Sequence, residues 1–70
     1  MYRVGIIGAG LIGSKRAAAL RSVDRLIAVA DLSRDKAKHL AEPYRAEVED
    51  SWESLIKRKD IDIVVIATSN

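Results

Sequence analysis

Residues 4–13 read VGIIGAGLIG, and this stretch determines the expected architecture. Apolar residues before the glycines predict a buried strand over residues 2–7, and alanine-rich residues after them predict a helix over residues 11–23. A G-x-G-x-x-G pattern between a strand and a helix is typical of a loop that binds the pyrophosphate of a dinucleotide. The stretch therefore predicts an anion site made by backbone amides.

Each glycine of this loop has its own expected role. Gly8 allows the tight turn out of the strand, Gly10 lets a pyrophosphate approach the backbone, and Gly13 lets the helix pack closely on the strand. The amides of Leu11 and Ile12 are the expected phosphate donors, because the helix dipole favours an anion at this end. The site therefore needs no basic side chain.

An acidic residue stands where such a site needs one. Asp31 follows a second apolar stretch, residues 26–30, and lies eighteen residues after Gly13. A carboxylate about 20 residues after the loop accepts hydrogen bonds from the adenosine ribose and repels a 2′-phosphate, so NAD is the expected cofactor. Arg34 lies nearby and can meet a 2′-phosphate, which keeps NADP open. The alternative is a purely architectural turn, with Asp31 capping the next helix.

The rest of the chain alternates between helices and strands. A helix is expected over residues 34–41, with Ser33 as its N-cap and Pro43 preventing its continuation. A brief strand is expected over residues 46–48, and residues 61–67 form the most apolar strand. The alternation predicts an α/β fold with a parallel sheet, an incomplete Rossmann dinucleotide-binding half in the order β-α-β-α-(β)-α-β.

A further helix is expected between the last two strands. Asp50 and Glu53 have the spacing of a capping box. Trp52, Leu55 and Ile56 have the spacing of a buried helical stripe, which predicts that Trp52 belongs to the core and is not a stacking platform.

Composition and charge limit the other function classes. The 70 residues carry a net charge of +2, which is too balanced to indicate nucleic-acid binding, and the basic run 57–59 is interpreted as a solvated helix end. The chain has no cysteine and a single histidine, His39, so no metal site is predicted, and a reducing cytoplasm fits. No segment approaches the roughly 20 apolar residues that span a membrane.

Three stretches resemble the Gfo/Idh/MocA oxidoreductases, the group of glucose-fructose oxidoreductase and inositol dehydrogenase. They are residues 4–13, residues 28–31 (AVAD) followed by a helix that contains Ala37, and residues 60–70 (DIDIVVIATSN). The resemblance covers the whole chain. It implies an NAD(P)-dependent enzyme that transfers a hydride to or from a sugar, a cyclitol or a related small molecule.

The resemblance also carries roles for the end of the chain. It implies that Thr68 and Asn70 contact the cofactor, and their position after the last strand fits the switch in strand order where ligands lie. From position alone, a polar start of the next loop is an equal alternative. Ser69 stands where the family often has proline. The family's following histidine, its Glu-Lys-Pro segment and its substrate domain lie beyond residue 70. No catalytic residue is therefore assigned, and residues 1–70 are expected to be the N-terminal part of a dinucleotide-binding domain, inactive alone.

Two other functions stay open from the sequence. One is a non-catalytic module that binds or senses NAD(H), and the other is the Rossmann half of an FAD-dependent oxidase or a methyltransferase. The segment after Asn70 would separate the enzyme from the sensor, and flavin absorbance would reveal FAD. The expected partners are a dinucleotide, a small-molecule substrate in the longer protein and further copies of the chain, because the last strand leaves an unpaired edge.

Overall fold

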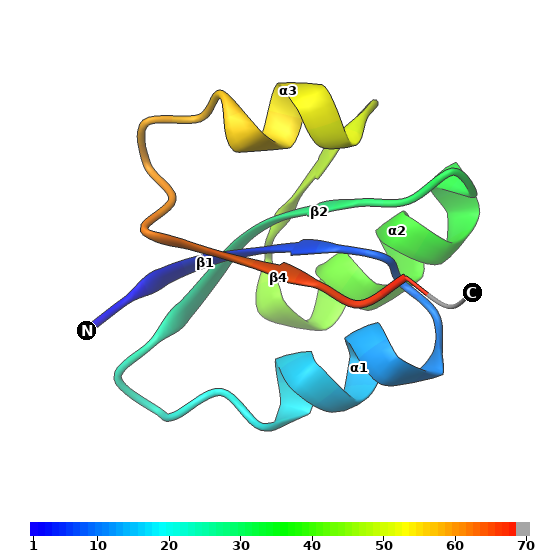
Figure 1. The fold of residues 1–70 in the computed structure, drawn as a ribbon. Coiled ribbons are helices and arrows are strands. Elements are labelled where there is room, and N and C mark those ends of the chain that lie inside the picture. Colours follow the sequence, from blue (N-terminus) through cyan, green and yellow to red (C-terminus); the bar gives the residue numbers. More distant parts are fainter. Residues whose placement is uncertain (69–70) are drawn as a thin grey trace.

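Four parallel strands form one sheet in the order β3-β2-β1-β4 (Figure 1). The computed structural model describes residues 1–68. The strands are β1 (Arg3–Ile7), β2 (Arg25–Ala30), β3 (Glu47–Glu49) and β4 (Ile63–Ile66). The chain moves outward from β1 to β3 and then returns to pair β4 on the other side of β1. The predicted α/β fold with a parallel sheet is confirmed, and the order switches between β1 and β4.

Helices cover both faces of this sheet. α1 (Leu11–Ala18) and α2 (Arg34–Ala41) lie on one face, and α3 (Trp52–Ile56) lies on the other (Figure 1). A 3-10 turn (Glu42–Tyr44) follows α2. Side chains alternate between two clusters: Ile6 and Val29 belong to the cluster under α1 and α2, whereas Ala28 joins Leu55 under α3. Both faces of the central strands are therefore buried.

Helix α2 was predicted correctly from its boundary residues. It spans Arg34–Ala41, and the Ser33 hydroxyl accepts a hydrogen bond from the Lys36 backbone N–H at 3.4 Å. The α-helix ends before Pro43, which lies in the 3-10 turn. The third strand lies one residue later than predicted, and the last strand is shorter than predicted, with Ile63–Ile66 in register with Val4–Ile7 of β1.

The first helix is shorter than predicted. α1 ends at Ala18, well before Val23, whose side chain is 55% exposed. The Asp24 carboxylate accepts a hydrogen bond of 2.9 Å from the backbone N–H of Tyr2 and another of 3.0 Å from the Arg21 side chain. These contacts hold residues 21–24 in a turn toward β2, and they outweigh the helix propensity of the alanines.

The start of α3 was also predicted wrongly. The N-cap is Ser51, whose hydroxyl accepts a hydrogen bond of 3.1 Å from the Ser54 backbone N–H. The capping box expected from Asp50 and Glu53 is therefore absent. A serine in extended conformation reaches the amide three residues later, so it displaces the aspartate that precedes it.

Only one residue of the predicted apolar stripe on α3 is buried. Leu55 is 0% exposed, whereas Trp52 and Ile56 are 51% and 50% exposed. A helix of five residues lays a single side chain against the sheet. The prediction that Trp52 belongs to the core is therefore wrong.

The basic run 57–59 is not simply a solvated helix end. Arg58 is 17% exposed, and its guanidinium lies 2.7–2.8 Å from the carboxylates of Glu47, Glu49 and Asp60. Its hydrogen bonds, the one with Asp60 foremost, raise the pKa of Arg58 above its ordinary value. This cluster ties β3 to the loop between α3 and β4.

Acid is expected to weaken the pairing of β1 with the loop before β4. Asp62 accepts hydrogen bonds from the guanidinium of Arg3 at 2.9 Å and from the Arg3 backbone N–H at 2.8 Å. Together these lower the pKa of Asp62 to about 2. An unfolded aspartate titrates near about 3.9, so the stabilisation is fully present above that pH and is lost as the pH falls through about 2.

We therefore expect the melting temperature of the Asp62→Asn variant to fall less steeply than that of the wild type between pH 5 and 2. Thermal melts followed by circular dichroism measure this. The control is Asp35→Asn, because Asp35 forms no ion pair with the residues that the structure describes. If the melting temperatures of the wild type and Asp62→Asn fall equally steeply between pH 5 and 2, Asp62 is not the group responsible for the loss of stability in acid.

Candidate nucleotide-binding site

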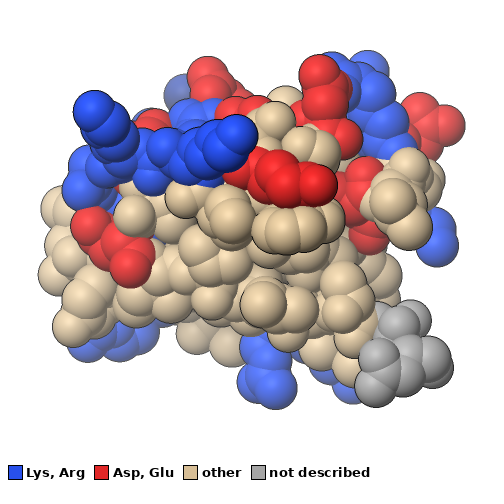
Figure 2. All heavy atoms as spheres, turned by 45° about the horizontal axis from the view of Figure 1, so that its top comes forward, with Lys and Arg blue, Asp and Glu red and all other residues tan. Residues whose placement is uncertain are grey.

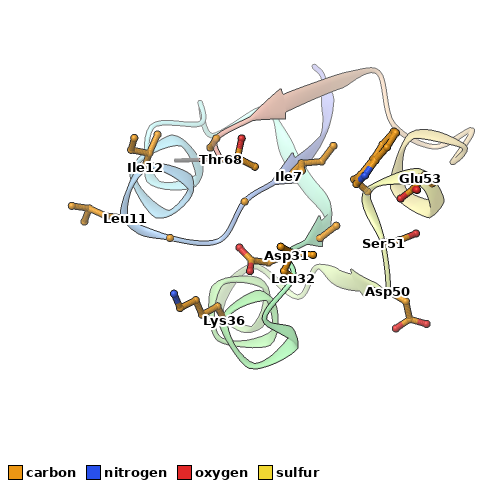
Figure 3. Close-up of a pocket in the computed structure, with 15 residues that line it drawn as sticks. Ile7, Leu11, Ile12, Asp31, Leu32, Lys36, Asp50, Ser51, Glu53 and Thr68 are labelled. Carbon is orange, nitrogen blue, oxygen red and sulfur yellow. The ribbon is translucent and has the colours of Figure 1, made fainter. Parts of the chain in front are cut away.

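A cleft of about 1030 Å³ opens at the carboxyl ends of the strands (Figure 3). Its walls come from the ends of β1, β2 and β4, from the starts of α1 and α2, and from the junction of β3 with α3. Six of the predicted cofactor residues line it: Gly8, Gly10, Leu11, Ile12, Asp31 and Thr68. The sheet edge with the switch in strand order is thus the place where the predicted residues meet.

Gly8 and Gly13 shape the turn that carries the loop. Gly8 has a φ of 105°, and a Cβ there would lie 2.7 Å from the backbone of Ala67, next to β4. A Cβ on Gly13 would lie 1.9 Å from the carbonyl oxygen of Gly8. Only glycine therefore lets α1 approach the end of β1, and Gly13 lies beneath the loop and does not line the cleft.

Gly10 is open where the other two are crowded. It is the N-cap of α1, with no side-chain hydrogen bond to the helix, and its φ of −80° and ψ of −159° suit any residue. A Cβ on Gly10 would meet no atom within 4 Å. The first N–H groups of an α-helix have no partner within the helix, so those of Leu11 and Ile12 face this open space. The arrangement fits an anion such as a pyrophosphate.

Asp31 connects the glycine loop with the residues after β2. One carboxylate oxygen accepts a hydrogen bond of 2.6 Å from the Ala9 backbone N–H, and the other accepts one of 2.7 Å from the Ser33 N–H. Partial burial works to raise the pKa of Asp31, but these two bonds and the charge of Lys36 outweigh it and lower the pKa below its ordinary value. The carboxylate is ionised at neutral pH, and each oxygen keeps a lone pair for a ribose hydroxyl.

The cation beside Asp31 is Lys36, and Arg34 is paired elsewhere. The Arg34 guanidinium forms an ion pair with Asp50 and does not line the cleft. Lys36 lines the cleft, and Figure 3 shows its side chain on α2 near Asp31. Sequence reasoning missed Lys36, although helical side chains lean toward the N-terminus and Lys36 is three residues after the N-cap.

The junction of β3 with α3 forms a wall that sequence reasoning did not predict. Asp50, Ser51, Trp52 and Glu53 all line the cleft. Their position directly after a parallel strand was the available signal, because the carboxyl ends of such strands share one edge. Asn70, a predicted cofactor contact, lies outside the described residues.

The part of the chain that the structure describes shows neither a metal site nor a membrane-spanning helix. Within residues 1–68 no three His, Cys, Asp or Glu side chains come together to hold a metal ion. His39 is exposed on α2, as expected. Among the same residues no helix has the length and the apolar character needed to cross a membrane.

Comparison with known proteins places this geometry. The model of an oxidoreductase family with an NAD-binding Rossmann fold matches residues 2–70. The chain belongs to this Gfo/Idh/MocA family. The resemblance seen in the sequence is thereby confirmed, and so is the NAD-binding Rossmann fold that it implies.

Both individual sequences and solved structures resemble this chain. The inositol 2-dehydrogenase of Acidothermus cellulolyticus is 41% identical over an alignment 71 positions long, which covers 96% of this chain and 21% of that protein. The myo-inositol dehydrogenase of Lactobacillus casei, in complex with NAD(H) and myo-inositol, has a TM-score of 0.89 at 27% identity, over 97% of this chain and 22% of that one. A 3-ketoreductase from Actinomadura kijaniata with NADP and TDP-benzene has a TM-score of 0.76 at 29% identity. The match covers 90% of this chain and 20% of that one. The chain spans about a fifth of the length of these relatives.

Proposed function

We propose that residues 1–70 are the N-terminal part of the dinucleotide-binding domain of an NAD(P)-dependent oxidoreductase. Its reaction is hydride transfer between a nicotinamide cofactor and a sugar, a cyclitol or a related small molecule. One observation carries the proposal: the open, uncapped start of α1 at Gly10 lies in the same cleft as the ionised Asp31. The inositol dehydrogenases among the relatives support the substrate class, and their greater length supports catalytic groups outside these residues.

The residues of the cleft divide the cofactor between them. The amides of Leu11 and Ile12 bind the pyrophosphate, and the Asp31 carboxylate accepts hydrogen bonds from the adenosine ribose. Thr68, together with Asn70, contacts the nicotinamide side. The bound cofactor would accept the hydride from the substrate or donate it, while this part of the chain binds and orients the cofactor.

Calorimetry with NADH and NADPH tests the proposed function directly. We expect NADH to bind the folded protein, and NADPH to bind it more weakly. Failure of both to bind a protein that circular dichroism shows to be folded would overturn the proposal. A non-catalytic NAD(H) module is the second candidate, and polyol-dependent reduction of NAD by the full-length gene product separates the enzyme from it.

Replacing Asp31 with serine is expected to change the choice of cofactor. The loss of hydrogen bonds from the ribose to a charged carboxylate weakens NAD binding by roughly 10- to 100-fold. NADP binding is retained or improved, because the carboxylate that repels the 2′-phosphate is gone and the Lys36 ammonium group lines the same cleft. Calorimetry on the Asp31→Ser variant measures both dissociation constants.

Two further variants identify the cation that meets the 2′-phosphate. Adding Lys36→Ala to Asp31→Ser should remove the gain for NADP, whereas adding Arg34→Ala should not, because Arg34 is paired with Asp50. Circular dichroism must accompany each variant, since one serine oxygen replaces the two carboxylate oxygens that accept the Ala9 and Ser33 backbone N–H groups. An unchanged ratio of the NAD and NADP dissociation constants would speak against the ribose role of Asp31.

We also propose that the protein associates with further copies of itself and works in the cytoplasm. The edge strand β4 supports association, because Ile63, Val64 and Ile66 are 39%, 37% and 72% exposed. Figure 2 shows a broad uncharged surface on this side of the molecule, below a region where acidic and basic side chains alternate. The absence of cysteine supports the location. Sedimentation velocity tests the association, which a stable monomer would contradict.

A further inference from the structure

The exposure of Trp52 has no explanation in the packing of the fold. Trp52 is the first residue of α3 and the only tryptophan of the chain. Its side chain is 51% exposed, whereas Leu55 on the same helix is fully buried. The exposed indole lines the cleft that holds Gly10 and Asp31. A large aromatic surface at the wall of a cleft is typical of a binding platform for a flat ring.

The direction of the dinucleotide leads from the glycine loop toward this indole. The pyrophosphate belongs at the start of α1 and the adenosine ribose at Asp31, which follows β2. The base continues beyond the ribose, away from α1. In Figure 3, Ser51 and Glu53 lie across the cleft from Leu11 and Ile12, with Asp31 between the two walls. The wall that faces the base is therefore the junction of β3 with α3.

The charges of this wall favour a base over a phosphate. Asp50 and Glu53 line the cleft beside Trp52, together with the Ser51 side chain. The charge of Asp50 is paired with that of Arg34, whereas Glu53 forms no ion pair with the residues that the structure describes. The Glu53 carboxylate repels a phosphate but can accept a hydrogen bond from an exocyclic amino group. Leu32, which directly follows Asp31, is fully exposed and also lines the cleft, so it adds apolar surface near the ribose acid.

We propose that Trp52 is the stacking platform for the adenine ring of the dinucleotide, and that Leu32 completes the apolar wall of this adenine subsite. The inference rests on the proposed function and extends it to a residue that the glycine pattern does not include.

Trp52 is the only tryptophan in residues 1–70, so the intrinsic indole fluorescence of a protein made of these residues reports on Trp52 alone. The protein is titrated with ADP-ribose, with AMP and with nicotinamide mononucleotide, none of which carries a reduced nicotinamide that would absorb the emission. We expect ADP-ribose and AMP to quench the emission saturably. Nicotinamide mononucleotide should not. Equal quenching by nicotinamide mononucleotide would overturn the assignment to adenine.

Variants test whether the indole contributes to affinity. Replacing Trp52 with alanine should weaken ADP-ribose binding by roughly 5- to 100-fold, as expected for loss of one base–aromatic stack, while Trp52→Phe retains most of the affinity. The affinity for inorganic pyrophosphate, which has no base, should be unchanged in both. Ile56→Ala is the matched control, because Ile56 is equally exposed on α3 and does not line the cleft.

Calorimetry on the wild type separates failure of this inference from failure of the proposed function. If ADP-ribose binds but the emission of Trp52 does not change and Trp52→Ala binds equally well, the platform is wrong and the dinucleotide site stands. If neither ADP-ribose nor NADH binds the folded protein, both proposals are overturned. If Trp52→Ala weakens pyrophosphate as much as ADP-ribose, the indole has only a structural role and the inference fails.

Discussion

The Gly10→Val variant is expected to lose dinucleotide binding while keeping its fold. A side chain on Gly10 meets no protein atom within 4 Å, and the backbone there has φ and ψ angles that valine readily adopts. The same side chain fills the space over the amides of Leu11 and Ile12. Two hydrogen bonds to a charged phosphate contribute about 1.5–3 kcal/mol each, so affinity should fall at least about 100-fold.

Calorimetry with NADH and circular dichroism measure the two halves of this prediction. Ala18→Val is the matched control, because Ala18 is an exposed residue on the same helix and does not line the cleft. The control should bind NADH as the wild type does. Undiminished binding by a folded Gly10→Val protein would show that the phosphates lie elsewhere.

The Gly13→Ala variant is expected to lose the fold itself. A Cβ on Gly13 would lie 1.9 Å from the carbonyl oxygen of Gly8, and no rotation of a side chain relieves a contact with the backbone. Helix α1 must then move away from β1. Overpacking costs about 1–3 kcal/mol and occasionally more, out of a total of about 5–15 kcal/mol for an ordinary domain and less for so short a chain.

The matched control is Gly10→Ala, which adds the same methyl group three residues earlier. Thermal melts followed by circular dichroism should show a cooperative transition for Gly10→Ala and a much lower one, or none, for Gly13→Ala. Equal melting temperatures would mean that α1 does not need the close approach that Gly13 provides.

The elements that could be predicted from sequence are those fixed by nearby residues. Ser33 and Pro43 mark the limits of α2, and their effects act within one turn of the helix. The apolar runs of β1 and β2 are continuous because both strands are buried on both faces. The glycine loop was recognisable because each of its positions has a separate steric requirement.

The end of α1 and the orientation of α3, which were predicted wrongly, depend on contacts distant in sequence. The end of α1 is set by the hydrogen bond of Asp24 with the backbone of Tyr2, 22 residues away. The orientation of α3 depends on which one of its few side chains enters the sheet. Periodicity assigned Trp52 and Leu55 to the same buried stripe, and only the position of the short helix over the sheet separates them.

The candidate site shows the same division. Gly8, Gly10 and Asp31 could be predicted, because a local pattern and a spacing identify them. Arg34 could not be excluded from sequence, since its ion pair is with Asp50, 16 residues away. The contribution of the β3–α3 junction was missed because a residue's place on the cleft depends on strand order, which no local pattern of residues specifies.

A titration of the ¹⁵N-labelled protein with ADP-ribose, followed by two-dimensional NMR, tests the phosphate site amide by amide. If the start of α1 holds the pyrophosphate, the amide resonances of Leu11 and Ile12 should shift saturably and by more than those at the far end of α1. If ADP-ribose binds but the resonances of these two amides do not shift, and the amides that do shift lie elsewhere in the protein, the pyrophosphate is not bound at the start of α1.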